Sequence, residues 1–147
     1  MCLRTISSTA EKVKILKDIP VTGLKVYKVV SDKDSAYFPL FSNLDTPYKI
    51  GVNEADTKEQ IIISYGNWQD DVKNLRYKAG FHSYITMEAA KNKAAQLRNP
   101  KDTKKLKIIL GIIDKSWITT IGTEAIADSK TNQIIEEIVI VSEKMKI

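Results

Sequence analysis

The chain has 147 residues, of which 43% are hydrophobic and 28% are charged. These proportions are typical of a globular domain, and they exclude disordered, collagen-like and low-complexity proteins. The net charge is +5, and only three of the 23 basic residues are arginines. Because proteins that read bases and phosphates rely on arginine for bidentate contacts, this balance disfavours nucleic acid as a partner. We expect one domain over residues 1–147, since domains commonly contain ~100–200 residues.

The distribution of cysteine and of apolar residues indicates a cytoplasmic protein, or one that acts in a host cytoplasm. Cys2 is the only cysteine, so the chain cannot form an internal disulfide. Residues 1–20 lack the apolar segment of a signal peptide. The longest apolar run, Ile108–Ile113, is far shorter than the ~20 residues that span a bilayer, so no membrane association is expected. One cysteine and one histidine, His82, do not make a zinc site, and we expect no metal or other cofactor.

In chain order, the pattern begins with a polar segment at 1–19, which predicts an N-terminal arm or a short helix at 9–18. Beyond it, apolar–polar alternation and β-branched residues predict strands. We expect them at Leu24–Val30, Gln60–Tyr65, Gly80–Ile85, Leu106–Ile113, Trp117–Ala127 and Ile134–Val141 (the last), with shorter extended stretches at 36–41 and 48–52. Gly122 leaves open whether residues 117–127 form one strand or two. Residues 67–79 are a connection without a clear pattern.

The clearest helix covers about residues 87–98. Its apolar side chains recur at spacings of three and four, which gives one narrow apolar face. These side chains are Met87, Ala90, Ala94 and Leu97. Thr86 can cap the first turn, and Asn99-Pro100 ends the helix. One main helix packed on an antiparallel or mixed sheet is an α+β fold.

The strand that precedes this helix carries the most informative side chains. Alternation places Gly80, His82 and Tyr84 on one face, where an imidazole and a phenol lie beside a residue without a side chain. One interpretation is a ligand pocket lined by His82 and Tyr84, with Lys78 or Arg76 near its mouth. The alternative is a half-buried histidine bonded to a neighbouring carbonyl, which is the more frequent role of a lone histidine.

Other reactive residues give weaker signals. Cys2 would be a nucleophile beside an amine if Met1 were removed, and the alternative is a buried apolar anchor. The adjacent carboxylates Asp70-Asp71 and Glu136-Glu137 point to opposite faces of an extended chain, so we interpret them as solvated charges. The lysines within 101–107 fit a charged turn better than a phosphate site.

Several short motifs follow one another in a recognisable order. The chain begins Met1-Cys2-Leu3, continues with a strand at Val26–Val30 and with Tyr37–Leu40, and then reads Gly80-Phe81-His82-Ser83-Tyr84 before a Thr-Met-Glu-Ala-Ala helix start. This order resembles a group of small proteins of phages, prophages and gut Bacteroidales. The resemblance covers most of the chain. It implies a phage or bacterial context and no established activity.

A more distant similarity is to ADP-ribosyltransferase folds. It rests on Tyr27-Lys28 in the first strand, on Gly80–Tyr84, and on Glu124 or Glu136 near the end of the chain. The first strand here contains neither the histidine nor the arginine of that family, and no clear glutamate motif follows. The similarity therefore implies a relative that binds a ligand rather than an active transferase, with Tyr27 and Lys28 as further binding residues.

These observations give three hypotheses. The first is non-enzymatic binding of a small anionic ligand, a nucleotide or an ADP-ribose-like molecule, by a phage protein that sequesters a host defence signal. Its ligand would contact His82, Tyr84, Lys78, Arg76, Tyr27 and Lys28. The second is a protein–protein interaction module, a homo-oligomer or a virion-associated protein, acting through a sheet edge or through Trp68 or Trp117. The third is an enzyme that uses Glu124, Glu136 or Cys2.

Overall fold

The computed structural model describes residues 3–40, 46–57, 60–65, 73–97 and 105–147. Within these residues the backbone forms two α-helices, one 3-10 turn and eleven strands. In chain order they are β1 (Thr5–Ile6), α1 (Thr9–Lys17), β2 (Leu24–Lys33), β3 (Ala36–Phe38), β4 (Val52–Glu54), β5 (Gln60–Tyr65), β6 (Lys73–Lys78), β7 (Phe81–Tyr84), α2 (Met87–Leu97), β8 (Lys105–Ile113), η1 (Lys115–Trp117), β9 (Ile118–Ala127), β10 (Ile134–Ser142) and β11 (Lys144–Lys146).

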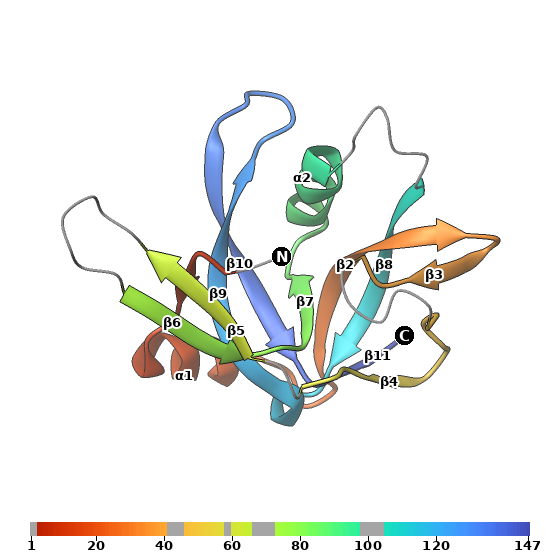
Figure 1. The fold of residues 1–147 in the computed structure, drawn as a ribbon. Coiled ribbons are helices and arrows are strands. Elements are labelled where there is room, and N and C mark those ends of the chain that lie inside the picture. Colours follow the sequence, from red (N-terminus) through yellow and green to blue (C-terminus); the bar gives the residue numbers. More distant parts are fainter. Residues whose placement is uncertain (1–2, 41–45, 58–59, 66–72, 98–104) are drawn as a thin grey trace.

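Most strands belong to one antiparallel sheet. Its order is β1-β9-β10-β7-β2-β8-β11-β4, and β3 pairs with β2 outside this path. The strands β5 and β6 form a separate hairpin. Figure 1 shows α2 between the β9–β10 hairpin and β8. The helix α1 lies away from α2, at the lower left of the view below β6. The α+β class is therefore confirmed, with an antiparallel sheet.

The short helix predicted at 9–18 is present as α1, and because it has nine residues against the eleven of α2, the helix at 87–97 is not clearly the dominant one. The helix α1 begins with a capping box, in which the Ser8 hydroxyl accepts from Glu11 N–H and the Glu11 carboxylate accepts from Ser8 N–H. Ile15 and Leu16 pack on the sheet, whereas Val13 is exposed. No helix in the described ranges combines the length and the apolar character needed to cross a membrane.

The central strands are buried on both faces, and each face has its own core. The helix-side core lies under α2 and comprises Leu3, Val29, Tyr77, Tyr84, Ala89, Ala90, Ile126, Val139 and Val141. The second-face core lies on the other side and comprises Val26, Phe81, Ile113, Ile118, Ile121, Ile140 and Met145. Alternation along β2 explains the division, since Val26 and Val29 point to opposite faces.

Several predicted elements are confirmed with small changes of boundary. The strands at 60–65, 80–85 and 106–113 are present as β5, β7 and β8. The helix α2 ends at Leu97, and the Thr86 hydroxyl caps it by accepting from Ala89 N–H at 3.1 Å.

Of the two alternatives left open for residues 117–127, the structure has one continuous strand, β9, which begins at Ile118 and whose Gly122 lies directly against β1. Other predictions need correction. β2 runs beyond the predicted end at Val30 to Lys33, since β3 folds back and pairs with its end. β6 occupies part of the unassigned connection, and β4 begins at Val52, where the predicted stretch at 48–52 ends. Finally, β10 is not the last strand, because β11 follows and bridges β8 and β4.

The close approach of β1 to β9 predicts which glycine is least replaceable. A Cβ at Gly122 would meet the Thr5 carbonyl oxygen and, at 2.7 Å, Leu3 Cδ1, whereas a Cβ at Gly111 would meet mainly the flexible Met145 side chain, with Sδ at 2.7 Å. We expect Gly122→Ala to lower the free energy of unfolding by about 2–3 kcal/mol and Gly111→Ala by about 1 kcal/mol. Chemical denaturation measures both values. Equal losses would contradict this account of β1.

Candidate functional site

The four side chains of β7 are all buried, and they divide between the two cores. Tyr84 belongs to the helix-side core, and His82 points to the same face, where it contacts Tyr77. Phe81 belongs to the second-face core, and Ser83 points there toward Met145. The alternation expected for this strand is therefore present.

Three hydrogen bonds in series connect Leu3, Tyr77, His82 and Gly80, and two of them involve the His82 ring. Leu3 N–H donates to Tyr77 Oη at 3.1 Å, and Tyr77 Oη lies 2.9 Å from His82 Nε2. His82 Nδ1 lies 3.1 Å from the carbonyl oxygen of Gly80. One assignment satisfies every partner: Nδ1 carries the proton, and the Tyr77 hydroxyl donates to Nε2. Desolvation, reinforced by the positive charge of Lys28, lowers the pKa of His82 to about 4, so the ring is neutral at pH 7.

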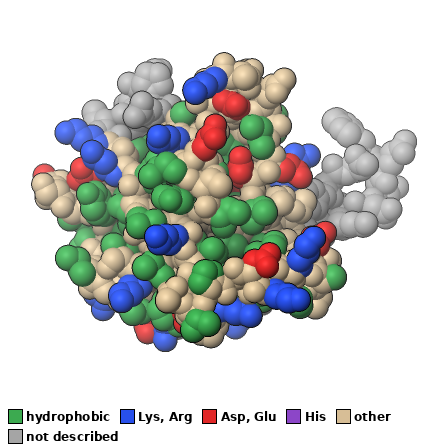
Figure 2. Space-filling view, turned by 180° about the vertical axis from the view of Figure 1, so that it is seen from behind, with side chains coloured by type: hydrophobic (Ala, Val, Ile, Leu, Met, Phe, Trp, Pro, Cys, Tyr) green, Lys and Arg blue, Asp and Glu red, His purple; other side chains and the backbone are tan. Residues whose placement is uncertain are grey.

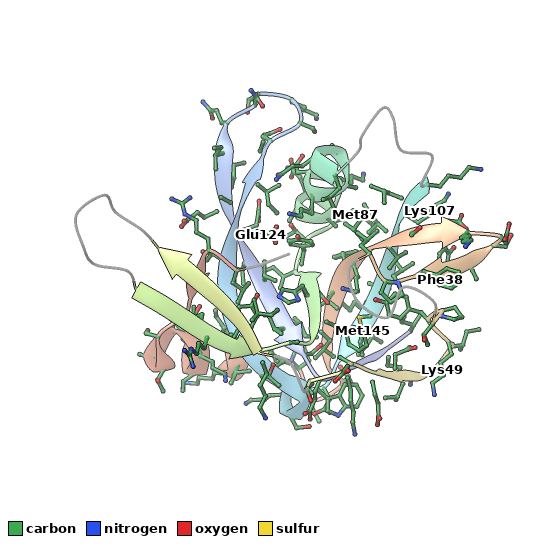
Figure 3. All side chains as sticks on the ribbon, in the orientation of Figure 1. Phe38, Lys49, Met87, Lys107, Glu124 and Met145 are labelled. Carbon is green, nitrogen blue, oxygen red and sulfur yellow. The ribbon has the colours of Figure 1, made fainter. Side chains whose placement is uncertain are left out.

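A second polar group joins α2 to the sheet. The Tyr84 hydroxyl donates to Glu124 Oε2 at 2.9 Å, and Lys93 of α2 forms an ion pair with Glu124 Oε1. Figure 3 shows Glu124 on β9, beside α2. Burial and the Glu124 charge raise the pKa of Tyr84 above its usual value. Both carboxylate oxygens of Glu124 are thus occupied by partners within the core, which is the arrangement of a structural ion pair.

The remaining predicted residues lie in different surroundings. Arg76 and Lys78 are exposed on either side of the buried Tyr77 in β6, so they occupy the outer face of the hairpin. Tyr27 is half-buried against the helix-side core, where its position pairs with Tyr84. The structure brings His82, Tyr84 and Tyr27 to one face of the sheet, and it separates them from Arg76 and Lys78.

Lys28 lies on the opposite face, in the second-face core. Its side chain is 8% exposed, its Nζ donates to the carbonyl oxygen of His82 at 2.9 Å, and it lies 5.8 Å from the centre of the Phe81 ring. Among the described residues, no carboxylate is within ion-pair distance of this ammonium. Desolvation accordingly lowers the pKa of Lys28 to about 8.

Two residues that carry hydroxyl groups, Tyr48 and Ser142, are neighbours of the same phenylalanine. The Tyr48 ring packs against the Phe81 ring with 5.9 Å between their centres, and Ser142 is the register partner of Phe81 in β10. Both hydroxyl oxygens are buried, and neither has a hydrogen-bond partner in the described parts of the chain. We call Lys28, Tyr48, Phe81 and Ser142 the Lys28 cluster.

Sequence reasoning missed two members of the Lys28 cluster. Ser142 continues the alternation by which Ile138 and Ile140 face the core. A serine at an inward-facing position of an apolar strand is therefore a sequence signal for a buried hydroxyl group. Tyr48 lies in a polar loop, where nothing in the local pattern indicates burial. Its placement depends on the distant Tyr37, whose carbonyl accepts from Tyr48 N–H at 2.8 Å.

The other candidate residues are less suited to a site. Glu136 is exposed and pairs with Arg4 at 3.5 Å, while Trp117 is half-buried against the second-face core. In the described ranges, no group of three or more His, Cys, Asp or Glu side chains is arranged to hold a metal ion. The candidates Cys2, Trp68, Asp70-Asp71, Lys101 and Lys104 lie outside the described residues.

The neutral His82 ring predicts a specific dependence of stability on pH. Between pH 4 and 6.5 the unfolded chain binds a proton at His82 that the folded chain does not, so the free energy of unfolding falls as the pH falls through this range. The loss is up to about 3 kcal/mol. His82→Gln retains an acceptor for Tyr77 but cannot ionise, and we expect its stability to change less with pH. Denaturation at a series of pH values tests this, and equal slopes would contradict the buried neutral ring.

The two faces of the sheet therefore hold different polar groups. On the helix side every contact of His82, Glu124 and Lys93 closes within the core, whereas the Lys28 cluster contains an ammonium without a carboxylate and two hydroxyls without partners among the described residues. Comparison with protein-family models, curated proteins and solved structures gives no match. The chain's own side chains are thus the basis for proposing its function.

Proposed function

We propose that this protein binds a small anionic ligand, a nucleotide or an ADP-ribose-like molecule, and does not transform it. The observation that carries the proposal is the buried ammonium of Lys28, which lies in a largely apolar core where the described residues offer it one acceptor, the carbonyl oxygen of His82. A lysine in such surroundings is seldom retained for stability alone, because taking a charge out of water is costly unless a counter-charge accompanies it.

The charge state of Lys28 favours an anion as that counter-charge. With a pKa of about 8, the side chain is mostly protonated at pH 7 even though it is buried. Neutral His82 contributes no compensating charge, and the nearest aromatic face, Phe81, offers only a weak cation–π contact at 5.8 Å. A bound anion would supply the missing negative charge in a region of low dielectric constant, where charge pairing is strong.

The biological role that fits this proposal is sequestration. A protein that holds a signalling nucleotide needs affinity and no catalytic group, and the resemblance to phage and prophage proteins favours a host defence signal as the ligand. Glu124, the buried carboxylate considered for transfer chemistry, is fully engaged by Lys93 and Tyr84. This arrangement favours binding over catalysis.

A second candidate function is protein–protein interaction, including contact with another copy of the chain. Val21 is fully exposed, and Ile50 and Ile134 are 95% and 71% exposed, so three loops or strand ends present apolar side chains to solvent. On the face seen in Figure 2, apolar side chains occur in groups between basic and acidic ones. Exposed apolar side chains of this kind contact partners in many complexes.

Ligand binding is tested by adding nucleotides, cyclic nucleotides and ADP-ribose at millimolar concentration. Because a ligand that binds only the folded state stabilises it by RT ln(1+[L]/Kd), we expect one class to raise the melting temperature. Lys28→Met should abolish the rise, whereas Lys25→Met, which removes an exposed lysine from the same strand, should retain it. A melting temperature unchanged by every nucleotide would reject the proposal. A rise retained in Lys28→Met would place the ligand elsewhere.

The buried charge also predicts how stability without ligand depends on pH. Between pH 8 and 10.5 the unfolded chain keeps the Lys28 proton that the folded chain has lost, so the free energy of unfolding rises with pH through this range. Lys28→Met should therefore be more stable than the parent by about 1–3 kcal/mol at pH 7, and this advantage should shrink toward pH 10.5. Denaturation at pH 7 and about pH 10 measures it. A variant less stable than the parent at pH 7 would show that the ammonium is compensated.

A further inference from the structure

We propose that the group bound at the Lys28 cluster is a singly charged oxyanion, a phosphodiester such as that of a cyclic nucleotide, which accepts hydrogen bonds from Lys28, Tyr48 and Ser142. This inference rests on the proposed function and goes beyond it in two respects. It assigns two hydroxyl donors, and it fixes the charge of the group that they hold.

The three residues that carry these donors are all neighbours of Phe81. Lys28 Nζ is 5.8 Å from the centre of the Phe81 ring, and the Tyr48 ring is 5.9 Å from the same centre. Ser142 pairs with Phe81 across the β7–β10 ladder. They reach this place from β2, from the loop before β4, and from the end of β10, so the sheet order brings together residues that are far apart in the chain.

The two hydroxyls have no hydrogen-bonding role within the described residues. The oxygen atoms of Tyr48 and Ser142 are both buried, and neither has a partner there. A buried hydroxyl without a hydrogen bond costs roughly 1–3 kcal/mol, so most such groups in folded proteins have a partner. Two such hydroxyls, together with an ammonium that no described carboxylate pairs with, come from residues around one phenylalanine and give a donor set suited to an oxyanion, since each hydroxyl can donate to an anionic oxygen.

The charge of the ligand group follows from the charge of the site. Among the described members of the cluster, Lys28 is the one with a positive charge, His82 is neutral and its side chain lies on the other face, and the second-face core, which includes Val26 and Met145, is apolar. One ammonium compensates a carboxylate or a phosphodiester, each of which carries one negative charge. A phosphomonoester carries close to two at pH 7 and above, because its second pKa is about 6. Its second charge would be buried without compensation.

The part of a larger ligand that lies outside the cluster would extend toward solvent past Tyr48. This side chain is half-buried, whereas Lys28 and Ser142 are buried, so Tyr48 is the member of the cluster nearest to solvent. The Asn53 side chain holds the loop around it, accepting from Lys49 N–H at 3.0 Å and donating to the Lys49 carbonyl at 2.9 Å. In Figure 3 Lys49 marks this loop at the side of the molecule near β4, whereas Met145 of the second-face core lies in the interior.

The test uses three small probes that differ in charge: acetate, dimethyl phosphate and methyl phosphate. Titration at about pH 8 is followed by the backbone amide NMR signals of Phe81 and Ser142. We expect dimethyl phosphate to bind about tenfold more tightly than methyl phosphate, because only a monoanion matches one ammonium. The comparison of acetate with dimethyl phosphate then distinguishes a carboxylate ligand from a phosphodiester. Equal or tighter binding of methyl phosphate, or tighter binding of acetate, would overturn the inference.

Two variants isolate the hydroxyls. Tyr48→Phe and Ser142→Ala should each weaken binding of the preferred monoanion about tenfold, since a hydrogen bond to a charged group is lost. Neither should destabilise the ligand-free protein, because the described residues give these hydroxyls no partner to lose. Tyr37→Phe, at a more exposed tyrosine, is the matched control and should leave binding unchanged.

The outcomes separate the two levels of proposal. Nucleotide binding that is lost in Lys28→Met but retained at full strength in both hydroxyl variants overturns the donor assignment and leaves the proposed function standing. If neither the nucleotides nor the small probes bind in a manner that depends on Lys28, both are overturned.

Discussion

The burial of β7 on both faces is the constraint on which the rest of the structure depends. A strand covered on one side can turn its polar groups to water, but Phe81, His82, Ser83 and Tyr84 are all enclosed. Every polar group at this position must find a partner inside the protein, because an unsatisfied buried donor or acceptor is costly. The positions of Tyr77, Glu124 and Lys28 follow from this requirement, since each places a polar atom against β7.

The two faces meet the requirement differently. On the helix side, Tyr77 binds His82 and Glu124 joins Tyr84 to Lys93, so the polar groups form closed sets that fix the β5–β6 hairpin and α2 on the sheet. On the second face, one carbonyl is the only hydrogen-bond acceptor that the described residues give Lys28. A core whose polar groups are all paired on one face, but not among the described residues of the other, is what the proposed ligand binding would require.

The amount of this structure that the sequence predicts depends on the range of the interactions involved. Alternation and capping depend on residues that are close in sequence, so the sequence predicts β7, β8 and α2 well. It also predicts that His82 and Tyr84 lie on the same face of β7. The strands β4 and β11 have three residues each and exist because they pair with each other, which no local pattern reveals. The Lys28 cluster is harder still, because Tyr48 and Ser142 are 94 residues apart and become neighbours of Phe81 only through the sheet order.

The pairing of β11 also has a consequence for how the chain folds. Residues 144–146 lie between β8 and β4, so the part of the sheet that contains β4 closes only after nearly the whole sequence is available. Pairings between such distant segments require large loops to close first, which makes folding slow compared with that of helical domains. During synthesis, β7 and β8 would have exposed edges until their partners β10 and β11 arrive, and exposed edges are sites of intermolecular pairing. The order in which the strands become available thus makes the nascent chain more prone to aggregation than the finished fold.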